Sequence, residues 1–580
     1  MFNVFKKLGW FFEKYKWQYT TAILLLMLAT VIEVIPPFVV GEMIDLISVG
    51  EMTYEILMWV IIGIVVLNII NYIVSYLWQY RLFEGALQLE RSLRKRMMNK
   101  FLKMTPTFYE RNRTGDLMAR STNDLNAVAE TAGFGIMALL DATFYLGTII
   151  LVMGFTVSWK LTLFSILPIP IIAYFIQYLG KILETRFSIA QDAFGELNDN
   201  VLESVAGVRV IRAYVQEQED IQRFNQKAEE VYDKYMNVVK INALFGPISK
   251  AGTAVCYLIA LGYGAVLISN NEMTVGGLVT FSILLGYVVW PIFAIAELIN
   301  VMQQGSASVT RVEEILLAKE DVTDLNQTVK TDPTSIRFED VSFTYPLSQQ
   351  KNLEQISLSL GKGQTLGIVG KTGAGKTTFI RQLLRQYPLG EGTIQIGDLD
   401  LSKQKKDDVL EWIGYVPQDH VLFSRTIREN ILFGKEDATD EEIHEAIRLA
   451  AFDKDLPNLP DGLETLVGEK GVSLSGGQKQ RVSIARALIK NPEILILDDS
   501  LSAVDAKTES KIIENLQNVR SNKTTIISTH RLSGITHADL IIVLEDGKVI
   551  EQGTHEELIN QNGWYKEQFD RQQLEGGENE

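Results

Sequence analysis

Six long apolar segments in the first half of the chain constrain its fold more than any other feature. Each is close to the ~20 apolar residues that a helix needs to cross a lipid bilayer. These segments are residues 19–40, 57–78, 136–155, 161–179, 248–269 and 278–299. Backbone amides must be hydrogen-bonded inside lipid, and segments of this length meet that need as helices. The sequence therefore predicts a membrane domain of six helices.

The Lys and Arg residues between these segments predict which side faces the cytoplasm. Residues 79–135 and 180–247 are long and rich in Lys and Arg, whereas residues 49–54 and 270–274 contain neither. Because cytoplasmic loops carry the excess of positive side chains, we expect both termini and both long loops to be cytoplasmic. Apolar residues at helical spacing within the long loops indicate that they extend the membrane helices.

The composition changes at the end of the apolar half of the chain. Beyond it the sequence reads as a charged, soluble α/β protein, after a polar segment that contains Pro333. The predicted parts are a transmembrane domain (1–317), a linker (318–334), a nucleotide-binding domain (335–571) and a polar C-terminal tail (572–580).

Charge and cysteine content exclude two classes of site. The formal net charge of −16 argues against a nucleic-acid partner, which would require a basic surface. The single cysteine, Cys256, lies in an apolar segment and cannot form a disulfide within one chain. We expect it to be a small core residue.

The strongest functional motif is a glycine-rich loop that fits the phosphate-loop pattern. It follows an apolar strand at residues 366–369 and precedes a predicted helix at residues 377–387, which is the context that the motif requires. Its residues are Gly370, Lys371, Thr372, Gly373, Ala374, Gly375, Lys376 and Thr377, followed by Thr378. The glycines let backbone N–H groups surround the phosphates of ATP. Lys376 would neutralise the β- and γ-phosphates, and the Thr377 hydroxyl would hold Mg²⁺.

An acidic pair follows a short apolar run at residues 494–497. A buried parallel strand that ends in Asp498 fits the Mg²⁺-side aspartate of nucleotide-binding sheets. Many buried strands end in an acidic residue, so this apolar run indicates a nucleotide site only because a phosphate loop precedes it in the chain.

A third motif identifies the family that the chain resembles. Leu474, Ser475, Gly476, Gly477 and Gln478 resemble the signature motif of ATP-binding-cassette (ABC) transporters. Residues 465–471 resemble the exporter-specific segment of the family. Residues 108–124 and 200–224 resemble the intracellular loops of bacterial multidrug exporters.

The resemblance assigns roles to further residues. It implies that Tyr345 stacks on adenine and that Gln418 contacts Mg²⁺ and the attacking water. It also implies that residues 502–505, which end in Asp505, cross a dimer interface, and that His530 lies near the γ-phosphate.

The family also implies the architecture and the activity. The expected fold is a type I ABC exporter: a six-helix transmembrane domain with long intracellular extensions, joined to an α/β P-loop nucleotide-binding domain. One such chain is half of a transporter, and its signature motif completes the ATP site of a second half-transporter. The resemblance implies ATP-driven export across a bacterial plasma membrane, with ATP and Mg²⁺ as cofactors and membrane lipid around the helices.

One residue departs from the family pattern. Active members place a glutamate directly after the strand aspartate, and this chain has Asp499. An aspartate is one methylene shorter, and a misplacement of ~1 Å can slow a reaction roughly 10²-fold. An intact signature with a weakened base resembles one subunit of heterodimeric bacterial multidrug exporters, of the BmrC type. A homodimer with two slow sites, or a site where aspartate suffices, remains an alternative.

Ionisable and aromatic residues within the apolar segments predict a substrate cavity. Charged groups inside spans usually face a cavity, and aromatic rings beside a carboxylate suit amphipathic cations. The candidate residues are Glu33, Tyr287, Trp290, Phe293 and Glu297. Ordinary helix packing also explains the aromatic residues. A lipid flippase and an ATP-gated channel or sensor share the ATPase motifs and remain alternatives to a drug exporter.

Overall fold

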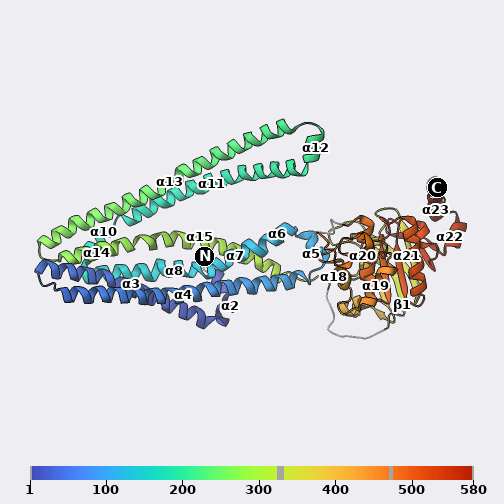
Figure 1. The fold of residues 1–580 in the computed structure, drawn as a ribbon, viewed down its shortest axis with the longest axis horizontal. Helices are drawn as coiled ribbons and strands as arrows, with labels where there is room; N and C mark the ends of the chain where they lie inside the picture. Colours follow the sequence, from blue (N-terminus) through green and yellow to red (C-terminus); the bar gives the residue numbers. More distant parts are fainter. Residues whose placement is uncertain (1–2, 323–331, 469–473, 578–580) are drawn as a thin grey trace. The chain divides into compact units, whose positions relative to one another are not determined.

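The computed structural model of the protein describes residues 3–322, 332–468 and 474–577. These residues form two units: the first comprises residues 3–101 and 115–318, and the second comprises residues 102–114 and the described residues from 319 onward (Figure 1). Parts of three expected segments lie outside the described residues: 323–331 of the linker, 469–471 of the exporter-specific segment and 578–580 of the tail. The predicted boundaries of the domains remain predictions.

Helices form the first unit. They are α1 (Asn3–Lys7), α2 (Gly9–Lys14), α3 (Lys16–Val49), α4 (Tyr54–Phe101), α6 (Thr114–Ala119), α7 (Leu125–Ala132), α8 (Phe134–Leu140), α9 (Leu146–Val152), α10 (Trp159–Ile166), α11 (Ile169–Ala206), α12 (Val208–Ala213), α13 (Glu217–Ser269), α14 (Val275–Tyr287) and α15 (Val289–Leu317). The π-helical stretches η1 (Arg120–Asp124), η2 (Asp141–Tyr145) and η3 (Met153–Ser158) lie between α6 and α10.

Five helices of the described chain are long and apolar enough to cross a membrane. The fourth expected segment, residues 161–179, is divided between α10 and α11 by Pro168, with Pro170 in the first turn of α11. Proline lacks the N–H group that a continuous helix would use, so the interruption follows from the sequence. Ser158 is extended (φ −168°, ψ 123°) and caps α10, where the chain turns back on η3. The count of six spans stays a prediction.

Small residues let α3 and α14 approach each other closely. A Cβ atom on Gly276 would lie 2.0 Å from the carbonyl oxygen of Gly41. Thr280 Oγ1 donates to the carbonyl of Pro37 at 3.0 Å, and Asp45 Oδ1 accepts the N–H of Gly276 at 2.7 Å. Apolar contact alone drives little association in lipid, so backbone proximity and interhelical hydrogen bonds hold such a pair together.

Helices α11 and α13 form a long hairpin with α12 at its tip. The two helices pack along each other, and Figure 1 shows the α12 end of the hairpin spread away from α7 and α15 of the same unit. Gly207 separates α11 from α12. The described part of α12 contains no buried residue. The hairpin therefore ends in a short helix whose described residues are not buried by the rest of this chain.

The second unit contains two sheets. Its strands are β1 (Ser335–Phe343), β2 (Leu353–Gly361), β3 (Thr365–Gly370), β4 (Glu391–Ile396), β5 (Leu399–Asp400), β6 (Ile413–Val416), β7 (Ile494–Asp498), β8 (Thr524–Ser528), β9 (Leu540–Glu545) and β10 (Lys548–Gly553). Its helices are α5 (Pro106–Arg111), α16 (Lys376–Leu383), α17 (Lys406–Trp412), α18 (Ile427–Leu432), α19 (Asp440–Leu449), α20 (Gly476–Leu488), α21 (Ala506–Val519), α22 (His555–Gln561) and α23 (Trp564–Gly577), with 3₁₀ turns η4 (Leu401–Lys403), η5 (Leu456–Asn458), η6 (Gly462–Glu464) and η8 (Leu532–Ile535).

The larger sheet is built around buried parallel strands. Its order is β10-β9-β3-β8-β7-β6, and only the β9–β10 pair within it is antiparallel. Alternate residues of β7 enter two different cores, Leu495 and Leu497 on one face and Ile494 and Ile496 on the other. Burial on both faces explains why this strand is a continuous apolar run. The smaller sheet, in the order β2-β1-β4-β5, is antiparallel.

The short helix α5 belongs to the second unit although it lies early in the chain. Pro106 occupies its first turn, where a missing N–H does no harm. The hydroxyl of Thr105 donates to Asp321, and the hydroxyl of Tyr387 donates to Glu110. A turn of the first long loop is thus hydrogen-bonded to residues of the C-terminal half of the chain.

We expect Gly276→Ala to destabilise the first unit, because the added methyl would overlap the carbonyl oxygen of Gly41. Overpacking of this kind typically lowers stability by about 1–3 kcal/mol. Thermal unfolding of the purified protein in lipid should therefore show a lower midpoint. Gly262→Ala is the matched control, because a Cβ there meets no atom within 4 Å. Equal midpoints for the two variants would contradict the close α3–α14 packing.

Candidate functional site

The glycine-rich loop lies between β3 and α16. Gly370, Gly373 and Gly375 have φ angles of 147°, 85° and 105°, which glycine adopts far more readily than other residues. A Cβ atom on Gly370 would also lie 2.1 Å from the carbonyl oxygen of Leu544. The glycines are thus required by the path of the loop. That path leads into the N-terminus of α16, where free N–H groups favour an anion.

Lys376 reaches back over the loop that precedes it. Its ammonium donates to the carbonyl oxygens of Gly370 at 2.7 Å and Lys371 at 3.1 Å, and its side chain is buried. Burial lowers the pKa of Lys376, while the nearby carboxylates of Asp499 and Asp498 oppose that shift. A buried cation beside these N–H groups is suited to phosphate oxygens.

The remaining residues of the glycine-rich loop do not lie beside the phosphate-binding N–H groups as Lys376 does. Lys371 points outward and pairs with Glu545 at 2.9 Å, and Thr372 is exposed at the crest of the loop. Ala374 is buried, and its carbonyl oxygen accepts the N–H of Gly547 at 3.1 Å. These contacts hold the shape of the loop.

Thr377 and Asp498 form a pair that fits Mg²⁺. The Thr377 hydroxyl donates to Asp498 Oδ1 at 3.2 Å. Asp498 Oδ2 is buried and has no hydrogen-bond partner among the described residues. Burial is the main cause that raises the pKa of Asp498, and the bond from Thr377 opposes it. A buried carboxylate oxygen without a donor is unfavourable unless a cation approaches it. Mg²⁺ is commonly held by one or two carboxylates together with phosphate oxygens and water.

Strand order brings these residues to one edge of the sheet. Strand β8 lies between β3 and β7, and Ser528 pairs with Ile368 on one side and Asp498 on the other. Parallel strands end at the same edge. The ends of the three strands therefore lie side by side. Asp498 is the last residue of β7, Lys376 begins the helix that follows β3, and His530 lies two residues after β8.

Asp499 and His530 lie close enough to Lys376 to interact electrostatically. Partial desolvation of the ring and the charge of Lys376 lower the pKa of His530, and Asp499 opposes both effects. The backbone of Asp499 is left-handed (φ 48°), and its N–H donates to the carbonyl of Ser528 at 2.8 Å. Aspartate tolerates this conformation better than most residues.

Tyr345 lies beside the helix that follows the phosphate loop. Its hydroxyl donates to Thr378 Oγ1 at 3.1 Å and accepts a bond from Arg381 at 3.3 Å. Its ring also packs edge-on against Tyr387, with centroids 4.8 Å apart. An aromatic ring is thus anchored at the side of α16, where an adenine base could stack on it.

Gln418 is not brought to the Thr377–Asp498 pair by any hydrogen bond in the described structure. It follows β6 by two residues and is exposed. Its predicted contact with Mg²⁺ and water stays a prediction.

The signature residues form the start of α20. Ser475 and Gln478 make a capping box, in which Ser475 Oγ accepts the N–H of Gln478 and Gln478 Oε1 accepts the N–H of Ser475 at 3.0 Å. Leu474 is buried, whereas Ser475 and Gly476 are exposed. No hydrogen bond in the described parts of the chain joins residues 474–478 to the phosphate loop.

The predicted interface loop packs on the signature helix. Gln480 accepts the N–H of Ala503 at 3.0 Å and donates to Ser502 Oγ at 3.3 Å. Asp505 accepts the N–H of Thr508 at 3.0 Å and so caps α21. Residues 502–505 thus link the starts of α20 and α21.

The structure adds functional candidates that the sequence interpretation missed. Arg531 donates to the carbonyls of Ser502 (3.0 Å) and Val504 (2.8 Å) and pairs with Glu509 at 2.8 Å. Its place directly after His530 was the one available signal. Glu110 and Tyr387 are 277 positions apart, and nothing in the sequence links them.

Three of the five predicted cavity residues, Glu33, Tyr287 and Trp290, lie near one another. Glu33 forms a hydrogen bond with Tyr145 and interacts electrostatically with Tyr287 and with Asp141, the acceptor of the Trp290 bond. Trp290 Nε1 donates to Asp141 Oδ2 at 2.9 Å. Glu297 is exposed and has no hydrogen bond or ion pair with a described residue, while Glu33 and Tyr287 are half-buried. Phe293 lines a pocket.

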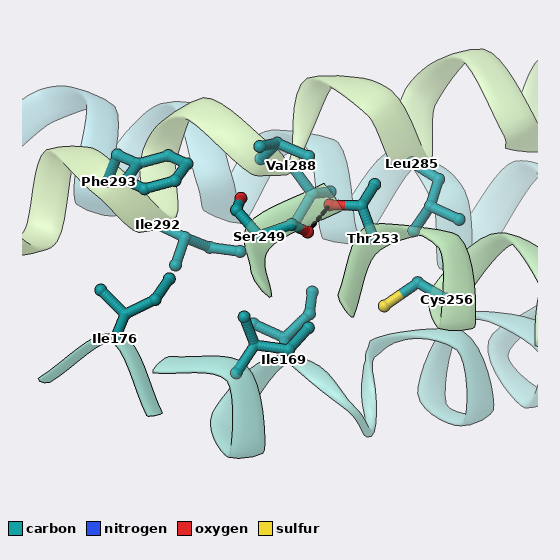
Figure 2. Close-up of a pocket in the computed structure, with 11 residues that line it drawn as sticks. Ile169, Ile176, Ser249, Thr253, Cys256, Leu285, Val288, Ile292 and Phe293 are labelled. Atoms are coloured by element: carbon teal, nitrogen blue, oxygen red, sulfur yellow. Dashed lines mark hydrogen bonds between the residues drawn. The ribbon is translucent and has the colours of Figure 1, made fainter. Parts of the chain in front are cut away.

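That pocket lies between α11, α13, α14 and α15 (Figure 2). Its walls are mainly apolar, with a polar strip on α13. The lining residues are Ile169, Ile172, Ile176, Ser249, Thr253, Cys256, Leu285, Val288, Val289, Ile292 and Phe293. Thr253 Oγ1 donates to the carbonyl of Ser249 at 2.9 Å, so its hydroxyl is already satisfied. Such a site suits an apolar or amphipathic molecule.

Comparisons with known proteins agree with this layout. The family description "ABC transporter transmembrane region" matches residues 19–292, and "ABC transporter" matches residues 353–502. The chain is 57% identical to the probable multidrug resistance ABC transporter ATP-binding/permease protein YheI of Bacillus subtilis, over 100% of both chains. It is 39% identical to the multidrug resistance-like ATP-binding protein MdlA of Escherichia coli, over 99% of this chain and 97% of that protein.

A solved structure has the same fold. The chain superposes on a bacterial Atm1-family ABC exporter with ATP bound with a TM-score of 0.80 and 26% identity, over 96% of this chain and 99% of that one.

We expect Asp498→Asn to remove the Mg²⁺ dependence of ATP binding. The amide can still accept the bond from Thr377, but it lacks the charge that the cation needs. The affinity gained from Mg²⁺ should fall at least about tenfold, which even outer-shell partners of a metal can contribute. Fluorescent-nucleotide titrations with Mg²⁺ and with EDTA measure it. Glu545→Gln, which removes only the outward partner of Lys371, should leave it unchanged. An unchanged Mg²⁺ effect in Asp498→Asn would refute the assignment.

Proposed function

The chain belongs to the ABC transporter family, as an ATPase-coupled exporter homologous to multidrug transporters, and we propose that it exports amphipathic small molecules as one subunit of a heterodimer. In this proposal its own ATP site hydrolyses slowly, and its signature motif completes the competent site of a different half-transporter. The protein is embedded in the bacterial plasma membrane with its ATPase domain in the cytoplasm. The Lys and Arg excess of the two long loops supports that orientation.

Two surfaces support a partner. ABC exporters of this kind work as dimers, and Ser475 and Gly476 stand exposed at the N-terminus of α20. A helix N-terminus with free N–H groups is a site for an anion, and in the dimer this anion is the γ-phosphate bound by the other subunit. The second surface is the tip of the α11–α13 hairpin, where Val210 and Tyr214 are 61% and 74% exposed. These apolar residues suit the ATPase domain of the partner.

Asp499 is the observation that carries the heterodimer proposal. It stands where a glutamate would polarise water for in-line attack, and its carboxylate is one methylene shorter. The left-handed backbone at this position gives aspartate an advantage that glutamate lacks. The local structure is therefore adapted to the shorter residue, and this supports a slow site as a stable feature of the subunit.

The other site residues retain their assigned roles in binding. Lys376 neutralises phosphate charge, and the N–H groups of the loop bind the phosphate oxygens. Thr377, Asp498 and Gln418 would hold Mg²⁺, which when bound would offset the charge of the phosphates. His530 contacts the γ-phosphate, and Tyr345 stacks on adenine. ATP can thus close the two ATPase domains on each other, and the long helices transmit that closure to the membrane domain.

We expect the purified chain in lipid to hydrolyse ATP slowly, and Asp499→Glu to raise the rate roughly 10²-fold. Asp499→Asn is the matched control, because it keeps the backbone preference but cannot act as a base. Thermal unfolding of each variant checks that strain at residue 499 has not unfolded the domain. Brisk hydrolysis by the unmodified chain, unchanged in Asp499→Glu, would favour a self-sufficient homodimer and overturn the heterodimer.

We also propose that the pocket in Figure 2, with Phe293 on its wall, takes the transported molecule. Glu33, Tyr287, Trp290 and Glu297 remain proposed contacts along the transport path. A carboxylate near aromatic rings favours an amphipathic cation.

Filling this pocket should weaken substrate binding. We expect Thr253→Phe to lower the affinity for rhodamine 6G, an amphipathic cation, at least about tenfold (~1.4 kcal/mol), measured by fluorescence anisotropy in nanodiscs. Val255→Phe is the matched control on the same helix, because Val255 is exposed outside the pocket. Equal affinities for both variants would remove the pocket from the substrate path. Displacement of the dye by phospholipid alone would favour a lipid flippase.

A further inference from the structure

Gln572 in the C-terminal helix α23 forms hydrogen bonds with the backbone on both sides of Arg531. Its Nε2 donates to the carbonyl of His530 at 2.8 Å, and its Oε1 accepts the N–H of Leu532 at 2.9 Å. One amide side chain thus satisfies an acceptor and a donor on the segment that carries the histidine. Because both bonds go to backbone atoms, they fix the direction of the chain at His530.

Helix α23 is anchored firmly enough to act as a support. Tyr565 is fully buried, and its hydroxyl bonds with His555 Nδ1 at 2.8 Å. Phe569 stacks on Tyr565 with an interplanar angle of 10°. The carboxylate of Glu551 accepts the N–H groups of Trp564 and Tyr565, which favours the helix at its N-terminus. Positions 565, 569 and 572 lie on one face of a helix. The packed face of α23 therefore presents Gln572.

The imidazole of His530 depends on this support. It is exposed and makes no hydrogen bond with another residue in the described ranges. On the far side the segment is held by Arg531, through its bonds to the carbonyls of Ser502 and Val504 and its pair with Glu509. The backbone at His530 thus lies between two anchors, one on α23 and one on the interface loop. The side chain of His530 itself adds no further hydrogen bond with a described residue.

We propose that Gln572 is a positioning residue that aims His530 at the γ-phosphate of ATP. The proposal rests on the role assigned to His530 above and extends the ATP site to a helix that the sequence motifs do not include. Without Gln572, the segment loses both of its bonds to α23, and the imidazole samples directions that miss the phosphate. ADP has no γ-phosphate, so its binding should not depend on Gln572.

Nucleotide selectivity tests this proposal without relying on hydrolysis. The full chain in lipid nanodiscs is titrated with Mg²⁺ and either AMP-PNP or ADP, in competition with a fluorescent nucleotide. A hydrogen bond to a charged group contributes about 1.5–3 kcal/mol, which corresponds to about tenfold or more in affinity. We expect Gln572→Ala to weaken AMP-PNP by about this factor and leave ADP unchanged. Gln573→Ala, an exposed neighbour on the same helix, should change neither.

A double-mutant cycle separates positioning from general stability. His530→Ala should reproduce the selective loss, and the double variant should lose no more than His530→Ala alone, because Gln572 acts through His530. Equal weakening of AMP-PNP and ADP, or additive losses, would show a structural role and overturn the proposal. If His530→Ala itself leaves the selectivity unchanged, the assigned role of His530 fails and the positioning role fails with it. If only Gln572→Ala has no effect, the positioning proposal alone fails.

Discussion

The parallel pairing of β3, β8 and β7 is the constraint on which the ATP site depends. It sets Ser528 between Ile368 and Asp498, so the loops after the three strands start at one edge. Asp498, Asp499 and His530 are then close enough to Lys376 to interact with it electrostatically. Because β7 and β8 are buried on both faces, slippage of this pairing would move apolar side chains out of two cores at once. The site is therefore held by the packing of the sheet.

The sheet edge that carries the ATP site also contacts elements outside the nucleotide-binding motifs. Arg531 joins the histidine segment to the interface loop, and Gln480 joins that loop to the signature helix. On the other side of α16, Tyr345 contacts Tyr387, whose hydroxyl bonds to Glu110 in α5. The described contacts thus run from the ATP site to the predicted interface loop in one direction and to α5 in the other. Each route consists of two or three contacts with defined geometry.

The packing of the membrane domain takes place in lipid instead of water. In lipid, apolar side chains gain little from meeting each other, so close approach at Gly41 and Gly276 and bonds such as Thr280 to Pro37 carry the specificity. The pocket between α11, α13, α14 and α15 shows the opposite arrangement, with helices held apart by branched and aromatic side chains. Its lining comes from three predicted spans, and no periodicity within one span could have located it.

The sequence by itself determined the class of the protein, because its short motifs require particular residues at fixed backbone positions and can be recognised from the sequence alone. The glycines of the phosphate loop, Asp498 after a buried strand and the signature residues Leu474–Gln478 could all be recognised in the sequence, since each motif depends on residues adjacent in the chain. The end of α16 was misplaced, because Arg385 adopts a left-handed backbone (φ 48°) that no propensity predicts, and the helix stops at Leu383. Tertiary structure alone decided the contacts between distant residues, such as Gln572 with His530 and Glu110 with Tyr387. Those pairs form because packed cores bring their backbones together, and sequence spacing carries no information about it.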